Sequence, residues 1–439
     1  MSAEQNGVTV DESARSQAAA DDAVSPSSPF DEQAFVDFLQ RVRGGAIERE
    51  TDRRLLFDEL AELRALGFGA LRIPVSAGGA GLTVEHLFEH LIDLSAADSS
   101  LGHVWRGHIL FVESLLAEPE EAYRQLWFGR LLTGDFVGNA QSERNATAHL
   151  ETELERSDDG LFVTGTKYYT TGSIYADWIH LSALDGEARI GLTVSAHDAG
   201  TRSTDDWDGF GQLLTGSGTT TFDRVAVDPR DIVELRGGAA GWHRTGALQQ
   251  LILVGVVAGI AQRAVEDTVA YVRARRRTVG FAGEHLPRED PLVQSVVGQL
   301  SSAAHVARAL VLSSARTLEA SVHGGEEGAR DVLLEVFKLQ QTVFPLVLDA
   351  LSRLFEVGGA SAVSRTHALD RHWRNVRTIA SHNPAAQRAA ALGQWELNGT
   401  LPEWQAPGRV ADPAVAAETE PPVAQGPSPD LEGPAISVP

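Results

Sequence analysis

The stretch GLFVTGTKYYTTG, residues 160–172, is where the chain changes from helical to extended patterning. Its β-branched and aromatic residues stand in short runs bounded by glycine and threonine, a pattern typical of β-strands. Three later segments follow the same rule: WIHLSAL (178–184), RIGLTVSA (189–196) and GTTTFDRVAV (218–227). We therefore predict a compact β domain over residues 134–236.

Helical spacing of apolar residues precedes and follows this β domain. FVDFLQRV and LLFDELAELRALG predict a helical N-terminal domain over residues 30–133, in which Gly67 ends a helix. Long apolar segments ending in DVLLEVFKLQQTVFPLVLDALSRLFEVGG predict a C-terminal four-helix bundle over 237–404. Residues 1–29 and 405–439 lack apolar periodicity, and we expect both tails to be disordered. The expected fold class is α+β, with a β-barrel or sandwich between two helical domains.

Composition argues against several classes of function. The 439 residues carry a formal net charge of −23 and include no cysteine. The negative charge argues against nucleic acid or a membrane surface as partner, and a thiolate metal site or cysteine nucleophile is ruled out. The longest apolar run, LILVGVVAGIA at 251–261, is shorter than the roughly 20 residues that span a bilayer. The N-terminus has no basic start and no apolar segment, so we expect a cytoplasmic protein.

Positive charge nevertheless gathers in RHWRNVRTIASHNP, residues 371–384. A cationic cluster in an acidic protein indicates a small anionic ligand. Arg371, Arg374 and Arg377 fall on nearly one helical face, where they either form ion pairs or contribute to a cofactor site.

HLFEH, residues 86–90, fits a two-histidine zinc pattern, because His86 and His90 lie one helical turn apart. A zinc site also needs a third ligand and access for water. We expect no metal site, and a zinc hydrolase stays as a distant alternative.

Several motifs, in order along the chain, resemble the acyl-CoA dehydrogenase superfamily over about residues 30–403. They are GNAQSE (138–143), GTKYYTTG (165–172), DPLVQ (290–294) and VGG (357–359) followed by LDRHWRNVRT. Within the superfamily, DDWDGFGQ, HNP and LNG are most similar to the flavin-dependent monooxygenase branch typified by dibenzothiophene monooxygenase and sulfur-acquisition oxidoreductases. This branch implies a homotetramer that uses O2 and reduced FMN, delivered by a separate NAD(P)H-dependent flavin reductase. FAD is the alternative cofactor.

A dehydrogenase of this fold needs a carboxylate base beside the flavin. By resemblance, Ala380 and Gln249 occupy the two positions where the superfamily places its glutamate, and neither accepts a proton at neutral pH. The resemblance therefore favours a monooxygenase that works through a hydroperoxide at flavin C4a on a small apolar molecule, with organosulfur compounds as candidates. An FAD-dependent acyl-CoA dehydrogenase is the alternative. A third interpretation is an inactive scaffold, which the retention of His382, Thr171 and Asn139 argues against.

The resemblance also assigns the site residues. His382 is expected to donate to the hydroperoxide, Thr171 to contact flavin N5 and His103 to face the substrate. Gly107 stands where dibenzothiophene monooxygenase has a tyrosine, which implies a different substrate. The expected cofactor-binding residues are Asn139 and Ser142 at the pyrimidine end of the ring, Trp207 against the ring or in the β-domain core, Ser217 at the ribityl chain or phosphate, Arg277 at the phosphate from a neighbouring subunit, and Gly358 and Gly359 at the phosphate or adenosine end.

Overall fold

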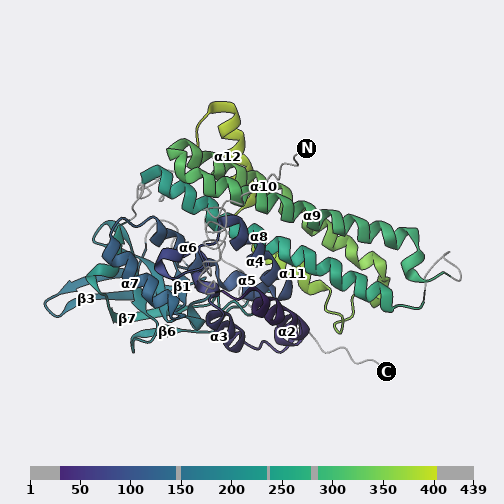
Figure 1. The fold of residues 1–439 in the computed structure, drawn as a ribbon, viewed down its shortest axis with the longest axis horizontal. Helices are drawn as coiled ribbons and strands as arrows, with labels where there is room; N and C mark the ends of the chain where they lie inside the picture. The colour runs from purple at the N-terminus through teal and green to yellow at the C-terminus, as the bar shows by residue number, and fades with distance from the viewer. Residues whose placement is uncertain (1–29, 145–149, 235–237, 278–284, 403–439) are drawn as a thin grey trace, which may run out of the picture.

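The structure is a computed structural model that describes residues 30–144, 150–234, 238–277 and 285–402. The two tails expected to be disordered lie outside the described residues. Along the chain, helices come first, strands follow and long helices end the fold, which confirms the α+β class (Figure 1).

The first part of the chain is helical, and polar side chains set where its helices begin. Asp31 accepts a hydrogen bond from the Ala34 amide at the start of one helix, and Asp98 accepts from two amides at the start of another. Gly67, with φ of 80°, follows the end of a third helix, as predicted. The helices are α2 (Glu32–Thr51), α3 (Phe57–Ala65), α4 (Val84–Ala97), α5 (Ser99–Val104), α6 (Arg106–Leu116) and α7 (Glu121–Leu132).

The middle of the chain forms one mixed sheet with the strand order β6-β7-β3-β2-β4-β5-β8. Strand β4 is central, because β1 pairs with it in parallel and β5 in antiparallel orientation. Its Ile179, Leu181 and Ala183 are buried, which fits the apolar pattern read from the sequence. The strands are β1 (Val137–Ala140), β2 (Glu153–Ser157), β3 (Gly160–Lys167), β4 (Trp178–Asp185), β5 (Ala188–Ser195), β6 (Thr201–Ser203), β7 (Thr220–Ala226) and β8 (Ile232–Glu234).

Long helices form the last part of the chain, and in Figure 1 they extend away from the sheet. Helices α8, α9 and α10 pack against one another, and α4 packs on α8. Helix α8 is long and apolar enough to cross a membrane, but 78% of its most apolar window is buried inside the protein, as in a core helix. The helices are α8 (Gly238–Ala274), α9 (Pro291–Ala320), α10 (Gly325–Arg353), α11 (Asp370–Ala380) and α12 (Ala385–Asn398).

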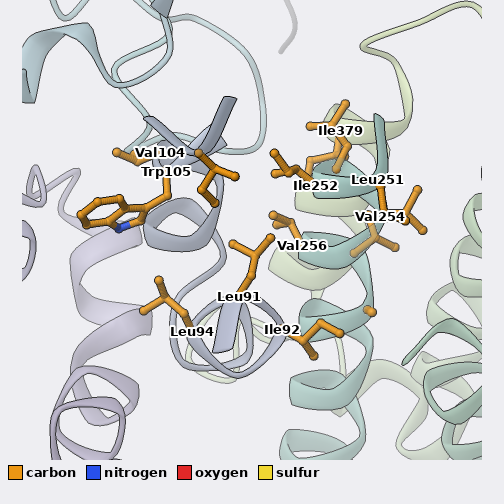
Figure 2. Close-up of a cluster of buried hydrophobic side chains, with 14 of the residues drawn as sticks. Leu91, Ile92, Leu94, Val104, Trp105, Leu251, Ile252, Val254, Val256 and Ile379 are labelled. Atoms are coloured by element: carbon orange, nitrogen blue, oxygen red, sulfur yellow. The ribbon is translucent and has the colours of Figure 1, made fainter. Parts of the chain in front are cut away.

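One buried cluster joins the N-terminal helices to the bundle (Figure 2). Val104 and Trp105 from the α5–α6 junction are fully buried there, and the other side chains labelled in Figure 2 come from α4, α8 and α11. Complete burial of one such apolar side chain stabilises the fold by about 1.5–3 kcal/mol. The chain on either side of Val104 and Trp105, which carries His103 and Arg106, is therefore held firmly in place.

Candidate active site

Three basic side chains that are distant in the sequence meet where α5, α6 and the end of α11 come together. His103 lies on α5, Arg106 begins α6, and His382 follows the last turn of α11. The charge of Arg106 lowers the pKa of both imidazoles, and His103 further lowers the pKa of His382. The structure thus brings together the two histidines that the sequence singled out as catalytic.

Burial keeps His103 neutral. The residue is 7% exposed, and burial together with the charge of Arg106 lowers the pKa of its imidazole to about 4. Its Nδ1 lies 3.1 Å from Oε1 of Gln212, so Nδ1 carries the proton and donates it. Its Nε2 is buried without a hydrogen-bond partner in the described part of the chain. His103 therefore offers an unused acceptor lone pair at Nε2.

Gln212 holds this arrangement through an unusual backbone conformation. It is fully buried with φ of 55°, a left-handed conformation that costs a non-glycine residue roughly 1–2 kcal/mol. Its amide N donates to Oδ1 of Asn375 on α11 (2.6 Å), and its Nε2 donates to Oγ of Ser99 on α5 (3.2 Å). These bonds offset the strain and fix the side chain that orients His103.

His382 lies on the solvent side of the cluster. The residue is exposed, yet the surrounding protein and the charges of Arg106 and Arg388 hold the pKa of its imidazole well below the usual range. The next residue, Asn383, anchors the turn, because its Nδ2 donates to Oε1 of Gln250 on α8. The same oxygen accepts a hydrogen bond from Gln340 on α10 (2.9 Å). The turn that carries His382 is therefore tied to two helices of the bundle.

Buried hydroxyls link Thr171 and Ser217 to the same cluster. Their Oγ atoms lie 2.7 Å apart, and Ser217 is also 2.7 Å from Oγ1 of Thr215. Thr215 donates in turn to the carbonyl of Gln212 (2.8 Å). The structure thus connects both predicted flavin-contacting hydroxyls, through Gln212, to His103.

Asn139 lies on β1, and α6 approaches it closely at Gly107. A Cβ added at Gly107 would lie 2.7 Å from Cβ of Asn139, which is too short for two carbon atoms. A tyrosine at this position would therefore force α6 and β1 apart. The departure at Gly107 noticed in the sequence thus has a physical reason.

Two other predicted cofactor residues lie at the edge of the β domain. Ser142 is exposed, and its carbonyl accepts from the amide of Tyr168 (2.9 Å). Trp207 is half-buried, and its indole donates to the carbonyl of Gly211 (3.1 Å). Its ring centre lies 6.2 Å from that of Tyr169. Trp207 is thus part of an aromatic surface and is not a fully buried core residue.

Arg277, Gly358 and Gly359 lie at the far end of α8. The lining of a cavity of about 610 Å³ there includes Arg275, Arg276 and Arg277, together with Tyr271, Ser361 and Thr366. Asp267, whose carboxylate is paired with Arg371, also lines it. Arg275 donates to the carbonyl of Gly358 (3.0 Å). A Cβ on Gly358 would lie 2.3 Å from both Arg275 Nη1 and Tyr271 Oη, so only glycine fits without rearrangement. Guanidinium and hydroxyl groups around one cavity suit a phosphate.

This cavity is far from the histidine cluster within one chain. The carbonyl of Gln249 accepts from Nε of Arg106 (3.3 Å), which fixes the position of the cluster along α8. From Gln249 to the end of α8 at Ala274 the helix axis covers roughly 38 Å at 1.5 Å per residue. One flavin mononucleotide is too short to reach from the cluster to Arg277 of the same chain.

The arginines of RHWRNVR are held by ion pairs within the chain. Arg371 pairs with Asp267, which also accepts from His372 (2.9 Å). Arg374 pairs with Glu50 (2.9 Å) on α2. Of the two alternatives for this segment, ion pairing therefore accounts for Arg371 and Arg374.

The HLFEH histidines have structural surroundings. Nδ1 of His86 lies 2.9 Å from the hydroxyl of Thr83, which caps α4. The ring of His90 packs against those of Phe30 and Phe35. Across the described residues, no group of three or more potential ligand side chains could hold a metal ion.

Comparison with known proteins shows what the chain is similar to. Residues 251–387 match the family model of the acyl-CoA dehydrogenase C-terminal domain. Dibenzothiophene monooxygenase of Mycolicibacterium goodii is 29% identical over 381 residues, covering 81% of this chain and 91% of that protein. FMN-bound TdsC from Paenibacillus sp. A11-2 matches with a TM-score of 0.79 at 26% identity, over 84% of this chain and 98% of that one. The chain thus resembles the acyl-CoA dehydrogenase superfamily in sequence and in fold.

A further relative supports the resemblance to flavin-dependent monooxygenases. A probable FMNH2-dependent monooxygenase, SfnC of Pseudomonas putida, is 29% identical over 374 residues, covering 82% of this chain and 90% of that protein. The similarity extends over nearly the whole length of each relative. The family resemblance inferred from the motifs is thus confirmed.

The polar groups of this acyl-CoA dehydrogenase-like chain fit a flavin. Thr171 and Ser217 offer buried hydroxyls, Nε2 of His103 is an unused acceptor, and Arg277 borders a cavity suited to phosphate. The first three groups suit the hydrogen-bonding edge of a flavin ring, and the cavity at Arg277 suits the phosphate of a different flavin molecule, because one FMN cannot span both places in one chain.

Two residues of the site were missed by sequence reasoning. Arg106 has buried Nη2 without a partner in the part of the chain that the structure describes, and Gln212 orients His103. Arg106 stands three residues after a histidine already singled out, so an arginine in the apolar surroundings of SLGHVWRGHILF was a usable signal. Gln212 gave no such signal, because its role depends on a contact across 109 positions of sequence.

Proposed function

We propose that this protein is the oxygenase of a two-component flavin-dependent monooxygenase, which uses reduced FMN and O2 to oxygenate a small, largely apolar molecule. Organosulfur compounds are the first candidates, because the relatives include a dibenzothiophene monooxygenase. The probable FMNH2-dependent relative and FMN-bound TdsC support FMN as the cofactor. When bound, reduced FMN supplies the two electrons that activate O2; one oxygen atom enters the substrate, the other leaves as water, and FMN is left oxidised.

The observation that carries the proposal is the pairing of two neutral imidazoles with Arg106. A dehydrogenase needs a carboxylate to remove a proton from carbon. Here the side chains at the two candidate positions are Ala380, which is buried, and Gln249, whose carbonyl accepts from Arg106. A neutral imidazole can instead accept a hydrogen bond at one ring nitrogen and donate one at the other, which suits a reacting oxygen. We assign the acceptor role to Nε2 of His103 and the donor role to His382.

We assign the remaining flavin-binding roles from the places that these residues take in the resemblance and in the fold. Thr171 and Ser217 orient the flavin ring through their linked hydroxyls, and the amide of Asn139 with Ser142 recognises its pyrimidine edge. Trp207 packs beside the ring. Val104 and Trp105, both fully buried, exclude water from the inner side of the cluster.

We further propose that Arg277, with Gly358 and Gly359, binds the flavin phosphate of a neighbouring subunit. The span of roughly 38 Å along α8 supports this, since one chain alone cannot put both groups around one FMN. An oligomer, with a homotetramer as the expected form, is then needed for a complete site. The sequence has no GxGxxG motif after a strand, which supports a separate NAD(P)H-dependent flavin reductase and a cytoplasmic location where that reductase works.

The test supplies the full-length protein with FMN, NADH, a flavin reductase and isotopically labelled O2, and offers a panel of aryl sulfides. The expected result is one labelled oxygen atom in the product for each NADH consumed. Copurification with FAD and anaerobic bleaching of that FAD by an acyl-CoA would refute the proposal and establish a dehydrogenase.

A variant pair tests the assignment of His382. His382→Ala is expected to release more hydrogen peroxide per NADH while FMN affinity stays the same, because the protein then lacks the donor beside the reacting oxygen. His305→Ala, at an exposed position on α9, is the matched control and should behave as the parent. An unchanged peroxide yield in His382→Ala would remove His382 from the mechanism.

A further inference from the structure

Arg106 differs from the other deeply buried arginines of this chain. Arg49 pairs with Asp98 (2.9 Å), and Arg371 pairs with Asp267. Arg106 is 5% exposed, yet the described residues supply it with no carboxylate, and its Nη2 has no hydrogen-bond partner there. Its only side-chain hydrogen bond within the described residues runs from Nε to the carbonyl of Gln249. A buried charge without a counter-ion is costly, so the fold bears a cost here that an anionic ligand would offset.

The surroundings of Arg106 increase the positive potential. Arg106 is the first residue of α6, so the positive end of that helix dipole lies at the same place. Arg388 adds a second guanidinium near His382. Burial lowers the pKa of Arg106 only to about 10, so its guanidinium is charged at neutral pH. An anion bound there would accept the hydrogen bond for which Nη2 of Arg106 has no partner within the described residues.

We propose that Arg106 is an anion subsite beside the reacting centre, and that the substrate of the proposed monooxygenase carries a small organic oxyanion, such as a sulfinate or carboxylate, next to its apolar part. This inference rests on the proposed function and specifies its substrate class. The flavin phosphate is distinguished from this anion by the test, which measures binding to protein already saturated with FMN. Reduced flavin, whose ring can carry a negative charge, is the other source of such an anion, and the test uses oxidised FMN so that the ring contributes no charge to the binding measured.

The experiment measures binding rather than turnover. Benzenesulfinate and methyl phenyl sulfone have the same phenylsulfonyl group, but only the first is charged. Each is titrated calorimetrically into the full-length protein saturated with oxidised FMN, whose ring is neutral. We expect benzenesulfinate to bind the parent more tightly than the sulfone does. Arg106→Gln should lower the affinity for benzenesulfinate roughly 10- to 100-fold, as expected for the loss of a charged hydrogen bond, and leave the affinity for the sulfone unchanged.

Two further variants make the result interpretable. Arg106→Lys keeps the charge but loses the planar guanidinium, so it should recover part of the benzenesulfinate affinity and serves if Arg106→Gln does not fold. Arg316→Gln removes an arginine that pairs with Glu85 on the outside of the bundle, and it should bind both probes as the parent does.

Three outcomes would overturn the inference: equal binding of the two probes by the parent, equal loss of both in Arg106→Gln, or a loss of affinity for FMN alone. The last would show that the guanidinium serves the cofactor. Absence of labelled oxygen in any product would count against the proposed function, whereas the binding result would still stand, so the two failures are distinguishable.

Discussion

Changing Gln212 to glutamate tests the state of His103 with a nearly isosteric substitution. Oε1 of Gln212 lies 3.1 Å from Nδ1 of His103, so the variant places a negative charge directly against the imidazole. Two opposite charges whose centres lie about 4 Å apart attract by about 4 kcal/mol at an effective dielectric constant of 20. That energy favours the imidazolium roughly 1000-fold. Since the parent imidazole has a pKa of about 4, the variant should protonate His103 within the neutral pH range.

The assay is the pH dependence of kcat/KM for coupled oxygenation. Protonation removes the acceptor lone pair at Nε2, so the variant should lose activity on the acid side of neutrality, where the parent stays active. Gln341→Glu adds the same charge on α10, where the glutamine side chain bonds to the carbonyl of Ala385, and should leave the profile unchanged. A Gln212→Glu protein with the parent's melting temperature and an unshifted profile would refute the role given to His103.

Three other perturbations have defined outcomes. Lowering the pH below about 6.5 should reduce the melting temperature steadily, because His108 and His372 have pKa values of about 4 in the folded protein and bind protons more readily in the unfolded chain. By pH 4 each of them should lower the free energy of unfolding by up to about 3 kcal/mol. Gly107→Ala should lower the melting temperature by the equivalent of about 1–3 kcal/mol, because its Cβ would press on Asn139, and calorimetry checks this. Arg277→Gln should lower the affinity for FMN about tenfold or more, which a fluorescence titration would measure. The number of subunits in the oligomer should not change.

Much of the fold could be predicted from the sequence because its determinants are local. The period of apolar residues separates the helical parts from the sheet, and Gly67 ends its helix through its own backbone preference. The pairing order of the strands could not be predicted in this way. In the sheet β1 lies in parallel beside β4, a contact between residues about 40 positions apart that no local pattern encodes.

The candidate site likewise has parts that local motifs predict and parts that only contacts in the folded chain determine. His103, His382 and Thr171 stand in recognisable motifs, so a family resemblance can suggest them. The contacts that set their chemistry are not local: Gln212 reaches His103 from the β domain, and Asn383 is held by Gln250 of α8. A protonation state depends on such contacts, so the neutral, oriented form of His103 could be known only from the folded chain.

The electrostatics of the site gives the strongest argument against thioester dehydrogenation by this chain. A carboxylate base beside the flavin would be stabilised as an anion by Arg106, and that stabilisation would lower its pKa and weaken it as a base. By the resemblance, the two candidate positions for that carboxylate hold Ala380 and Gln249 in this chain, and the guanidinium donates to the Gln249 carbonyl. The positive potential that remains favours developing negative charge on oxygen over removal of a proton from carbon. On the proposal made here, the absence of that acid and the unpaired Nη2 of Arg106 serve the same chemistry: a site that holds an oxyanion and does not remove a proton from carbon.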